Sequence, residues 1–322
     1  MSVFRRLRSS FEHGVHPAHH KQQTEHLPIQ RVPFGKDYVM PLGQHIGVPA
    51  SAVVTTGERV RRGQLIAEPG GFVSTGLHSP VTGTISDIGD VRGVDGRFAP
   101  AISIEADSFA TQKMDEVSAV DWESMSLEEF IKAVQMAGIV GMGGAAFPAH
   151  VKLSVPDGIR IRHLLINGAE CEPYLTTDHR LMLERPQALL EGAEIMRQKL
   201  GAEDTIIGIE ANKPDAIDIV QKHIQPGDPV RVVPLKVKYP QGAEKMMIKS
   251  VFDVEVPAGQ LPRDVEVNVN NVGTIVAIAD YFLRGMPLIE RVVTVAGPGV
   301  TYPANLIVPL GTPVRDVVKF CG

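Results

Sequence analysis

The residues most suited to chemistry lie in a glycine-rich segment, GIVGMGGAAFPAHVK, at positions 138–152. Gly141, Gly143 and Gly144 carry no Cβ, so their backbone can adopt positive φ and their amides can approach a phosphate or a flat ring closely. The spacing to Ala146 formally fits a dinucleotide fingerprint, but that fingerprint requires a preceding strand. The loop predicts a nucleotide cradle, and the alternative is a glycine-rich cap joining two helices.

The residues before the loop predict a helix. Ser126 is a suitable N-cap, Glu128 and Glu129 would lie in the first turn, and apolar residues recur at helical spacing from Leu127 to Ala137. An ordinary Rossmann first turn is therefore disfavoured, and we expect a helix–loop–helix cradle.

Two carboxylates follow a predicted buried strand at residues 163–167. Glu170 and Glu172 would both be dehydrated in a cleft, which is costly unless they accept hydrogen bonds. Ribose hydroxyls are suitable donors, whereas a phosphate would be repelled. The alternative is a solvated acidic turn.

A second polar group follows another predicted strand. Asn270, Asn271 and Thr274 lie where that strand enters a helix, and amides can both donate to and accept from a flavin edge or a phosphate. Paired asparagines are also common in turns, so this segment alone is a weak signal.

The middle of the chain alternates predicted strands and helices, which indicates an α/β layer with a parallel sheet. The predicted strands cover residues 163–167, 205–210 and 230–235, and the helical stretches between them cover 180–200 and 214–223. Ligands collect beyond the carboxyl ends of such strands, where residues 167–172 would lie.

Taken in order, these segments resemble the flavin-carrying, NADH-oxidising subunit of respiratory complex I. The match covers Gly141 to Lys152, Asn167 to Pro173 and Val269 to Thr274. The segment YPQGAEK, residues 239–245, resembles a Tyr-x-x-Gly-Glu-Glu segment of that family, with Ala243 in place of the first glutamate.

A closer resemblance, over nearly the whole chain, is to the RnfC subunit of the Rnf electron-transport complex. The GVHP segment at 14–17, Lys21, Thr24 and the LGQHIG segment at 42–47 resemble its amino-terminal signature, which complex I lacks. The resemblance implies a peripheral subunit on the cytoplasmic face of the bacterial inner membrane. It would oxidise NADH on bound FMN and pass electrons to iron–sulfur clusters, with ferredoxin and the other Rnf subunits as partners.

The resemblance also implies which residues bind the cofactors. FMN would be held by Gly141, Gly143, Gly144, Ala145, Lys152, Asn167, Asn270, Asn271 and Thr274, with Lys152 countering phosphate charge. NADH would face Phe147, Glu170, Glu172 and Glu244, and Tyr239 is counted with the cofactor-binding residues. Alternatively, Lys152 is a solvated helix residue and Phe147 a core residue. No catalytic acid or base is expected, because the cofactor carries the chemistry of hydride transfer.

The chain has only two cysteines, Cys171 and Cys321. Members of the Rnf family carry 4Fe-4S clusters on a carboxy-terminal ferredoxin-like segment with repeated cysteine motifs, and two distant cysteines cannot hold such a cluster. We therefore expect no metal site here and an electron-exit domain that is absent from this chain. Cys171 is flanked by glutamates that raise a thiol pKa, so we expect an inert, packed thiol.

Composition indicates a soluble globular protein of several domains. The net charge of −5 disfavours nucleic acid as a partner, and no apolar run reaches the ~18 residues needed to cross a bilayer. The expected domains are an extended arm at 1–38, a lipoyl-like barrel sandwich at 39–115, an FMN- and NADH-binding α/β domain at 116–288 and a β-grasp, SLBB-like module at 289–322.

Two features outside the α/β domain receive structural roles. The barrel sandwich has no lysine between residues 68 and 79, where a swinging carrier would need one, so we expect a packing or docking module. The histidines of the arm lack regular metal-ligand spacing, so we expect the arm to dock on another surface.

Three hypotheses for function remain. The first is an NADH dehydrogenase module of an Rnf complex. The second is a cobalamin reductase-like flavoprotein of the same fold. The third is a non-enzymatic docking scaffold, which the departure at Ala243 leaves open.

Overall fold

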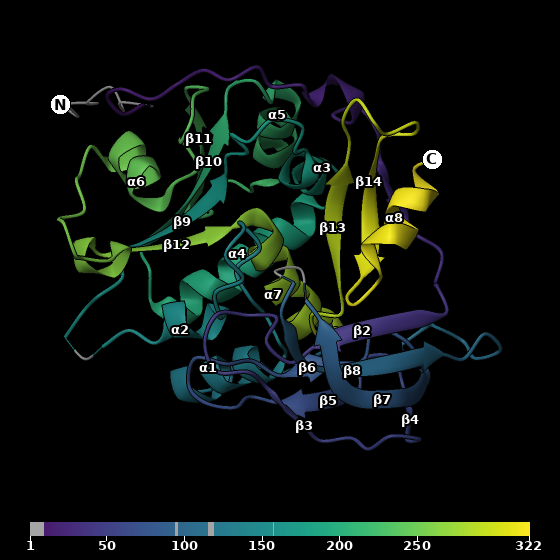
Figure 1. Ribbon diagram of the computed structural model, residues 1–322. Helices are drawn as coiled ribbons and strands as arrows, with labels where there is room; N and C mark the ends of the chain where they lie inside the picture. Colours follow the sequence, from purple (N-terminus) through teal and green to yellow (C-terminus); the bar gives the residue numbers. More distant parts are fainter. Residues whose placement is uncertain (1–9, 94–95, 115–118, 157) are drawn as a thin grey trace, which may run out of the picture. The chain divides into compact units, whose positions relative to one another are not determined.

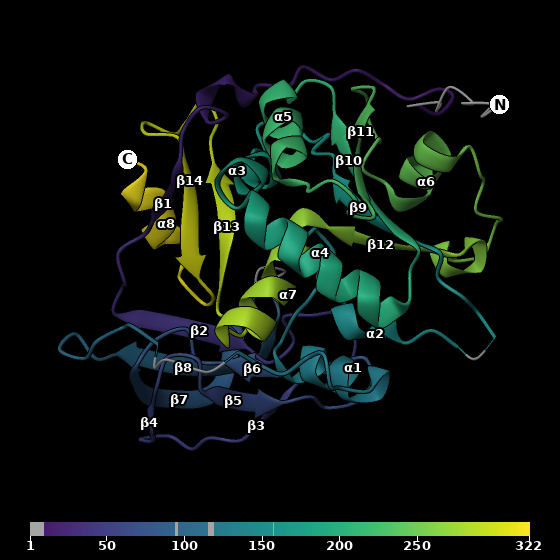
Figure 2. The same cartoon turned by 180° about the vertical axis from the view of Figure 1, so that it is seen from behind.

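The computed structural model describes residues 10–93, 96–114, 119–156 and 158–322, which divide into two compact units. The first unit combines the N-terminal segment up to Pro28 with Val155–Val276, and the second combines Ile29–Ser154 with Ala277–Gly322 (Figures 1 and 2). Each unit is assembled from two separate stretches of chain, and the four domains expected from the sequence stay a prediction.

The first unit is built on a four-stranded parallel sheet of order β11-β10-β9-β12. Its strands are β9 (His163–Gly168), β10 (Asp204–Glu210), β11 (Val230–Leu235) and β12 (Val267–Asn271). The sheet and the three strands predicted in it are confirmed. Parallel strands bury both faces, which explains why β9 and β10 are nearly continuous apolar runs. All four strands end at the same edge of the sheet.

Helices cover both faces of this sheet. On one face, α6 (Glu244–Phe252) packs its apolar residues on the sheet in a cluster that includes Leu165, Ile206, Val269 and Met247. Figure 2 shows α4 (Pro186–Leu200) and α5 (Pro214–His223) on the other face.

The helix predicted over residues 180–200 is interrupted. It forms two helices, α3 (Thr177–Glu184) and α4, separated at Arg185. Pro186 causes the break because proline has no N–H to donate inside a helix, whereas it is well suited to the first helical position.

The second unit contains the expected barrel sandwich. One antiparallel sheet has the order β2-β8-β7-β4 and the other β3-β5-β6. The strands are β2 (Asp37–Pro41), β3 (Ser51–Ala52), β4 (Arg59–Val60), β5 (Leu65–Glu68), β6 (Leu77–His78), β7 (Gly83–Arg92) and β8 (Phe98–Ala106). Alternate residues point inward, and the core includes Tyr38, Met40, Ile66, Ile85 and Ile104.

A third sheet joins distant parts of the second unit. In it β14 (Ala304–Pro309) pairs in parallel with β1 (Ile29–Arg31) and antiparallel with β13 (Glu290–Val295). The short helix α8 (Val314–Phe320) follows and adds Val317 to the cluster around Leu306 and Val308. Residues 29–31, which the sequence places in the extended arm, are therefore an edge strand of this sheet.

An ion-pair cluster links the sandwich to this third sheet within the second unit, with Arg62 and Glu290 largely buried and Arg31 exposed. Glu290 accepts two hydrogen bonds from Arg31, at 2.7 and 2.8 Å, and one from Arg62. Burial alone would raise the pKa of Glu290, but its bonds with Arg31 and the charges of both arginines hold that pKa below its usual value. The carboxylate is therefore ionised wherever the unit is folded near neutral pH.

Three further helices adjoin segments that the sequence predicts to bind a cofactor. Helix α1 (Leu127–Met136) begins at the predicted cap, and Ser126 and Glu129 form a reciprocal capping box. Helix α2 (Ala149–Leu153) follows the glycine-rich loop, and α7 (Val272–Arg284) follows β12 directly. Within the described ranges, no helix is both long and apolar enough to cross a membrane.

Candidate functional site

The glycine-rich loop joins α1 to α2 in the second unit, as the sequence predicts. Its base is closed by hydrogen bonds from Gly141 N to Phe147 O at 2.8 Å and from Ala149 N to Ile139 O at 3.0 Å. Residues 142–146 lie between these two contacts. Gly144 has a φ of +123° and Ala146 a φ of +49°, so the loop needs backbone conformations that glycine adopts at low cost.

The tip of the loop offers hydrogen-bond donors. Gly143, Gly144 and Ala145 are exposed. Within the described part of the chain, the amide nitrogens of Gly143 and Gly144 donate to no other group. If Gly144 carried a Cβ, that atom would meet no other atom within 4 Å, so packing leaves open space at this glycine. The exposed amides of the tip suit an anion or the polar edge of a ring.

The helices on both sides of the loop are fixed to the barrel sandwich within the second unit. Gln135 of α1 donates to Gly71 O and Ser74 O, each at 3.1 Å. His150 of α2 is 1% exposed, and its Nε2 lies 2.7 Å from Phe72 O. Burial lowers the pKa of His150 despite this bond, so the ring is neutral at pH 7. The sandwich thus holds the two helices that carry the loop, which agrees with the packing role expected for this domain.

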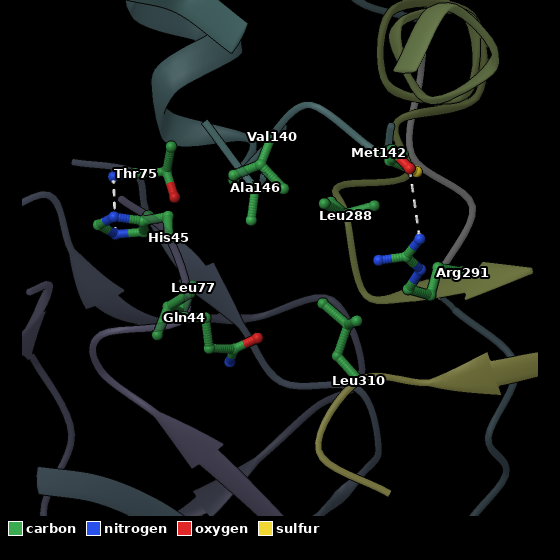
Figure 3. A pocket seen from close by; sticks show the side chains of 12 residues that line it. Gln44, His45, Thr75, Leu77, Val140, Met142, Ala146, Leu288, Arg291 and Leu310 are labelled. Atoms are coloured by element: carbon green, nitrogen blue, oxygen red, sulfur yellow. Dashed lines mark hydrogen bonds between the residues drawn. The ribbon is translucent and has the colours of Figure 1, made fainter. Parts of the chain in front are cut away.

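A cavity of about 110 Å³ lies beside the loop in the second unit (Figure 3). Its lining comes from the loop, the sandwich and the C-terminal segment: Gln44, His45, Thr75, Gly76, Leu77, Gly138, Val140, Met142, Ala146, Leu288, Arg291 and Leu310. Arg291 lies across from Met142 and donates to its carbonyl oxygen at 3.5 Å, and His45 Nε2 accepts from Thr75 N at 3.2 Å. Sequence reasoning did not predict this cavity, because its lining comes from distant segments.

In the first unit, asparagines organise the carboxyl edge of the parallel sheet. Asn167 donates from Nδ2 to Gly242 O at 2.7 Å and accepts from Ala169 N at 3.0 Å. Asn271 donates to Asp178 Oδ2 at 2.5 Å. These amides hold the loops that follow β9 and β12, and the contacts with a cofactor expected from the sequence stay a prediction.

Asn270 and Thr274 are also buried at this edge. Asn270 is 4% exposed and donates to Asn268 Oδ1 at 2.5 Å, and Thr274 is 1% exposed in the first turn of α7. Asn270 belongs to β12 and Thr274 to α7, so buried polar side chains lie on both sides of the junction between them.

Glu170 is the most completely bonded of the predicted residues. It is 1% exposed, and its Oε1 accepts from Asp178 N at 2.7 Å and from Thr177 Oγ1 at 3.1 Å. Its Oε2 accepts from His179 N at 3.1 Å. The carboxylate therefore caps the N-terminus of α3, where a negative charge also suits the helix dipole. The sequence placed it toward a ribose instead.

A second buried carboxylate supports the first. Glu210, at the end of β10, accepts from Glu170 N at 3.1 Å and from Lys213 Nζ at 2.8 Å through its Oε2. Its Oε1 is buried and has no hydrogen-bond partner among the described residues. Sequence reasoning missed Glu210 and Lys213, although a glutamate at the end of a buried strand with a lysine three residues later was a usable signal.

The other predicted residues are more accessible. In the first unit, Glu172 is exposed, Tyr239 is 42% exposed and Glu244 begins α6. In the second unit, Phe147 and Lys152 are partly buried on and after the loop. The structure thus gathers the predicted residues into two groups, the carboxyl edge of the sheet in one unit and the glycine-rich loop with α2 in the other.

Cys171 lies beside the acidic residues but is poorly suited to reaction. It is 7% exposed, and burial raises the pKa of its thiol, with further contributions from the charges of Glu172 and Glu210. The sequence predicted that Cys171 is an inert, packed thiol, and its burial agrees with that prediction. Among the described residues, no group of three or more histidine, cysteine or acidic side chains could hold a metal ion.

Three family models match the chain. Residues 9–109 match the RnfC barrel sandwich hybrid domain, residues 134–280 the Nuo51 FMN-binding domain and residues 292–322 the SLBB domain. The fold class predicted from the sequence is therefore confirmed for all three parts.

Several curated relatives are similar over nearly the whole chain. The C subunit of the proton-translocating ferredoxin:NAD(+) oxidoreductase complex of Clostridium ljungdahlii is 44% identical, over 97% of this chain and 68% of the relative. The C subunit of the Na(+)-translocating complex of Acetobacterium woodii is 37% identical, over 97% of this chain and 71% of the relative. For the C subunit of the ion-translocating oxidoreductase complex of Pseudomonas aeruginosa, at 39% identity, this chain spans 40% of the relative's length.

A solved structure shares part of the fold. The NAD+-reducing [NiFe]-hydrogenase in the H2-reduced state aligns with a TM-score of 0.51 at 20% identity, over 66% of this chain and 46% of that chain. At this level of identity the likeness concerns the fold alone.

Proposed function

The chain belongs to the RnfC family, the C subunits of ion-translocating ferredoxin:NAD(+) oxidoreductase complexes, and from this premise we propose that it binds FMN and oxidises NADH. Electrons then pass to iron–sulfur clusters and to ferredoxin. Because the chain has only two cysteines, those clusters have their ligands in other segments of the complex. We place the protein at the cytoplasmic face of the membrane, held there by the other Rnf subunits.

The observation that carries the proposal is the exposed tip of the glycine-rich loop. Two amide donors at Gly143 and Gly144 are free of internal partners among the described residues, and Gly144 leaves open space where a side chain would project. The loop lies inside the span that matches an FMN-binding domain. A donor set of this kind fits the phosphate or the ring edge of a flavin. When bound, FMN supplies a ring that accepts two electrons together and releases them singly.

The chain's own residues bind and orient the nucleotides. Lys152 of α2 counters the phosphate charge of FMN, and Phe147 offers a flat surface to the nicotinamide or the adenine. Glu172 and Glu244 accept from the ribose hydroxyls of NADH, and carboxylates at that place repel the extra phosphate of NADPH. Tyr239 is the remaining residue that we assign to nucleotide binding.

The residues that hydrogen-bond to the chain itself at the sheet edge act differently. Asn167, Asn271 and Glu170 hold the loops after β9 and β12 and the start of α3 in place. Their contribution is to keep the exposed residues in a fixed geometry, because hydride transfer is sensitive to the distance between donor and acceptor atoms. No side chain needs to donate or remove a proton for the hydride to move.

The test is an absorbance titration of the purified chain with FMN, followed by anaerobic addition of NADH. We expect bound flavin that bleaches on NADH and not on an equal concentration of NADPH. Flavin that never binds to a demonstrably folded chain would favour the docking scaffold. Flavin that binds but keeps its absorbance with NADH would contradict the dehydrogenase activity.

Lys152→Met tests the assignment of the phosphate contact. Removing a single charge-assisted contact with a phosphate weakens binding by about tenfold or more. Lys222→Met, which changes an exposed lysine of α5, is the matched control and should bind FMN as the unmodified chain does.

A further inference from the structure

We propose that the N-terminal arm, residues 11–27, positions the two loops that carry Glu172 and Tyr239, and that Lys21 is its central positioning residue. The inference rests on the proposed function, since Glu172 and Tyr239 are proposed there to lie at the nucleotides. The two loops are the acidic loop, residues 170–176, and the tyrosine loop, residues 236–243. The arm and both loops belong to the first unit.

Lys21 holds the backbone of the acidic loop. It is 4% exposed, and its Nζ donates to Glu172 O at 3.0 Å and to Leu175 O. An ammonium group is rarely buried this completely unless it has strong partners. Because the contact is with the backbone of Glu172, the carboxylate of that residue stays available to a ligand while its main chain is fixed.

Other arm residues hold the end of the same loop. Thr24 Oγ1 and Thr176 Oγ1, both fully buried, lie 2.8 Å apart and share a hydrogen bond. Tyr174 donates from its backbone nitrogen to His19 O at 2.9 Å. The acidic loop is thus contacted by the arm at several successive positions.

His20 of the arm and Tyr174 of the acidic loop contact each other, and each has an unfavourable backbone conformation. His20 has a φ of +49° and Tyr174 a φ of +68°, and their rings stack with centroids 5.0 Å apart and planes 14° apart. Residues other than glycine adopt such backbone angles at a cost, and they keep them only where the surroundings over-determine the conformation. Strain of this kind gathers at functional sites and indicates that the conformation of the acidic loop matters.

The arm also pairs with the tyrosine loop. Val15 and Tyr239 exchange two backbone hydrogen bonds, at 2.9 and 2.8 Å, like residues of an antiparallel sheet. Gly14 has a φ of +94°, and a Cβ there would lie 2.8 Å from Tyr239 O, so only glycine fits. Lys238 completes the contact by donating to His13 O at 3.0 Å.

The charge of Lys21 has a further role. Burial lowers the pKa of Lys21, while the negative charges of Glu170 and Glu210 oppose that shift. Two buried carboxylates and the exposed Glu172 therefore share one region with the ammonium of Lys21 and that of Lys213. Without Lys21, the acidic loop would be more negative, which disfavours a dinucleotide that carries a negative pyrophosphate.

Side-chain hydrogen bonds join the arm to the acidic loop, to the tyrosine loop and to Arg180 of α3. Sequence reasoning expected the arm to dock on a surface, and the structure identifies the loops it contacts.

The test compares Lys21→Met with the control Lys222→Met in the FMN-loaded chain. Methionine keeps most of the side-chain volume but removes the charge and both hydrogen bonds. In anaerobic stopped-flow reduction we expect the NADH concentration for half-maximal rate to rise by about tenfold, while the limiting rate changes less than twofold. FMN should remain bound. The control should match the unmodified chain in all three respects.

Hydrogen–deuterium exchange gives a readout that needs no cofactor. Backbone amides of residues 172–176 and 237–239 should exchange faster in Lys21→Met than in the control. Unchanged exchange in both segments would overturn the proposal, and so would faster exchange with an unaltered NADH dependence. If the unmodified chain is not reduced by NADH, the proposed function fails, while the exchange experiment still decides whether the arm positions the loops.

A second pair of variants covers the case in which Lys21→Met does not fold. Thr24→Val removes the buried hydroxyl with little change in shape, and Thr24→Ser retains it. We expect Thr24→Val to raise the NADH requirement and the exchange of residues 172–176, and Thr24→Ser to restore both. Equal behaviour of the two variants would contradict a positioning role for this contact.

Discussion

Replacing Glu170 with glutamine is the most direct test of how the carboxyl edge of the sheet is held together. The carboxylate is 1% exposed and accepts the backbone N–H groups of both Asp178 and His179 in the first turn of α3. Thr176, the residue at the N-cap position, makes no side-chain capping bond of its own. Glu170 therefore supplies the side-chain cap of α3, although it lies on the preceding loop.

The expected loss of stability follows from the bonds that glutamine cannot make. In either orientation its amide nitrogen would replace one oxygen and face a backbone N–H, leaving that donor buried without an acceptor. An unsatisfied buried group costs about 1–3 kcal/mol, and losing the charge at the helix N-terminus adds about 0.3–1 kcal/mol. We therefore expect Glu170→Gln to lower the free energy of unfolding by about 1–4 kcal/mol.

Urea denaturation followed by circular dichroism measures this loss, and exchange of the Asp178 and His179 amides localises it. Glu68→Gln makes the same chemical change at an exposed position and should stay within about 0.5 kcal/mol of the unmodified chain. If Glu170→Gln is as stable as this control, the carboxylate does not cap α3 and its burial has another cause.

Three further outcomes follow from groups elsewhere in the chain. Glu290→Gln should destabilise the second unit by about 3–5 kcal/mol, because Arg62, whose side chain is 9% exposed, would keep a buried charge without a counter-charge. Since the pKa of Glu290 is lowered on folding, its stabilisation is present above the unfolded value of about 4.3 and is lost as pH falls through the folded value, which an acid titration of unfolding would show. Gly192→Ala would place a Cβ 2.1 Å from Ile275 O in the first unit, so a clash costing about 1–3 kcal/mol should outweigh the gain in helix propensity of about 1 kcal/mol and lower Tm. Cys171 should react with iodoacetamide at pH 7.5 far more slowly than free cysteine, because burial raises the pKa of its thiol; rapid labelling of the folded chain would contradict that assignment.

The elements that the sequence predicted well are those whose signals are local. Helix α1 begins where Ser126 and Glu129 form their capping box, and both residues lie within one turn of the helix. Strand β1 has no such signal, since it is a three-residue edge strand that exists through pairing with β14. No periodicity can be recognised over so short a segment.

For the candidate site, the positions of residues along the elements could be predicted from the sequence, but their side-chain contacts could not. The position of Glu170 after β9 followed from the order of strands and helices, whereas the direction of its carboxylate depended on where α3 begins. That start was hidden by treating residues 180–200 as one helix. Lys21 and Glu172 could not be joined from the sequence at all, because 151 residues separate the two partners of their hydrogen bond.

The buried charges at the edge of the parallel sheet have a common physical cause. Loops that follow parallel strands must stay open to a ligand, so they cannot be fixed by covering them with apolar residues. Here they are fixed by hydrogen bonds to groups that remain buried, such as Glu170 and Lys21. Buried ion pairs seldom add more stability than apolar residues of similar size. They do impose one geometry on the backbone they bond, and the hydride transfer proposed above requires such a backbone. On this argument, substitutions at these buried groups should impair nucleotide binding even where the chain remains folded.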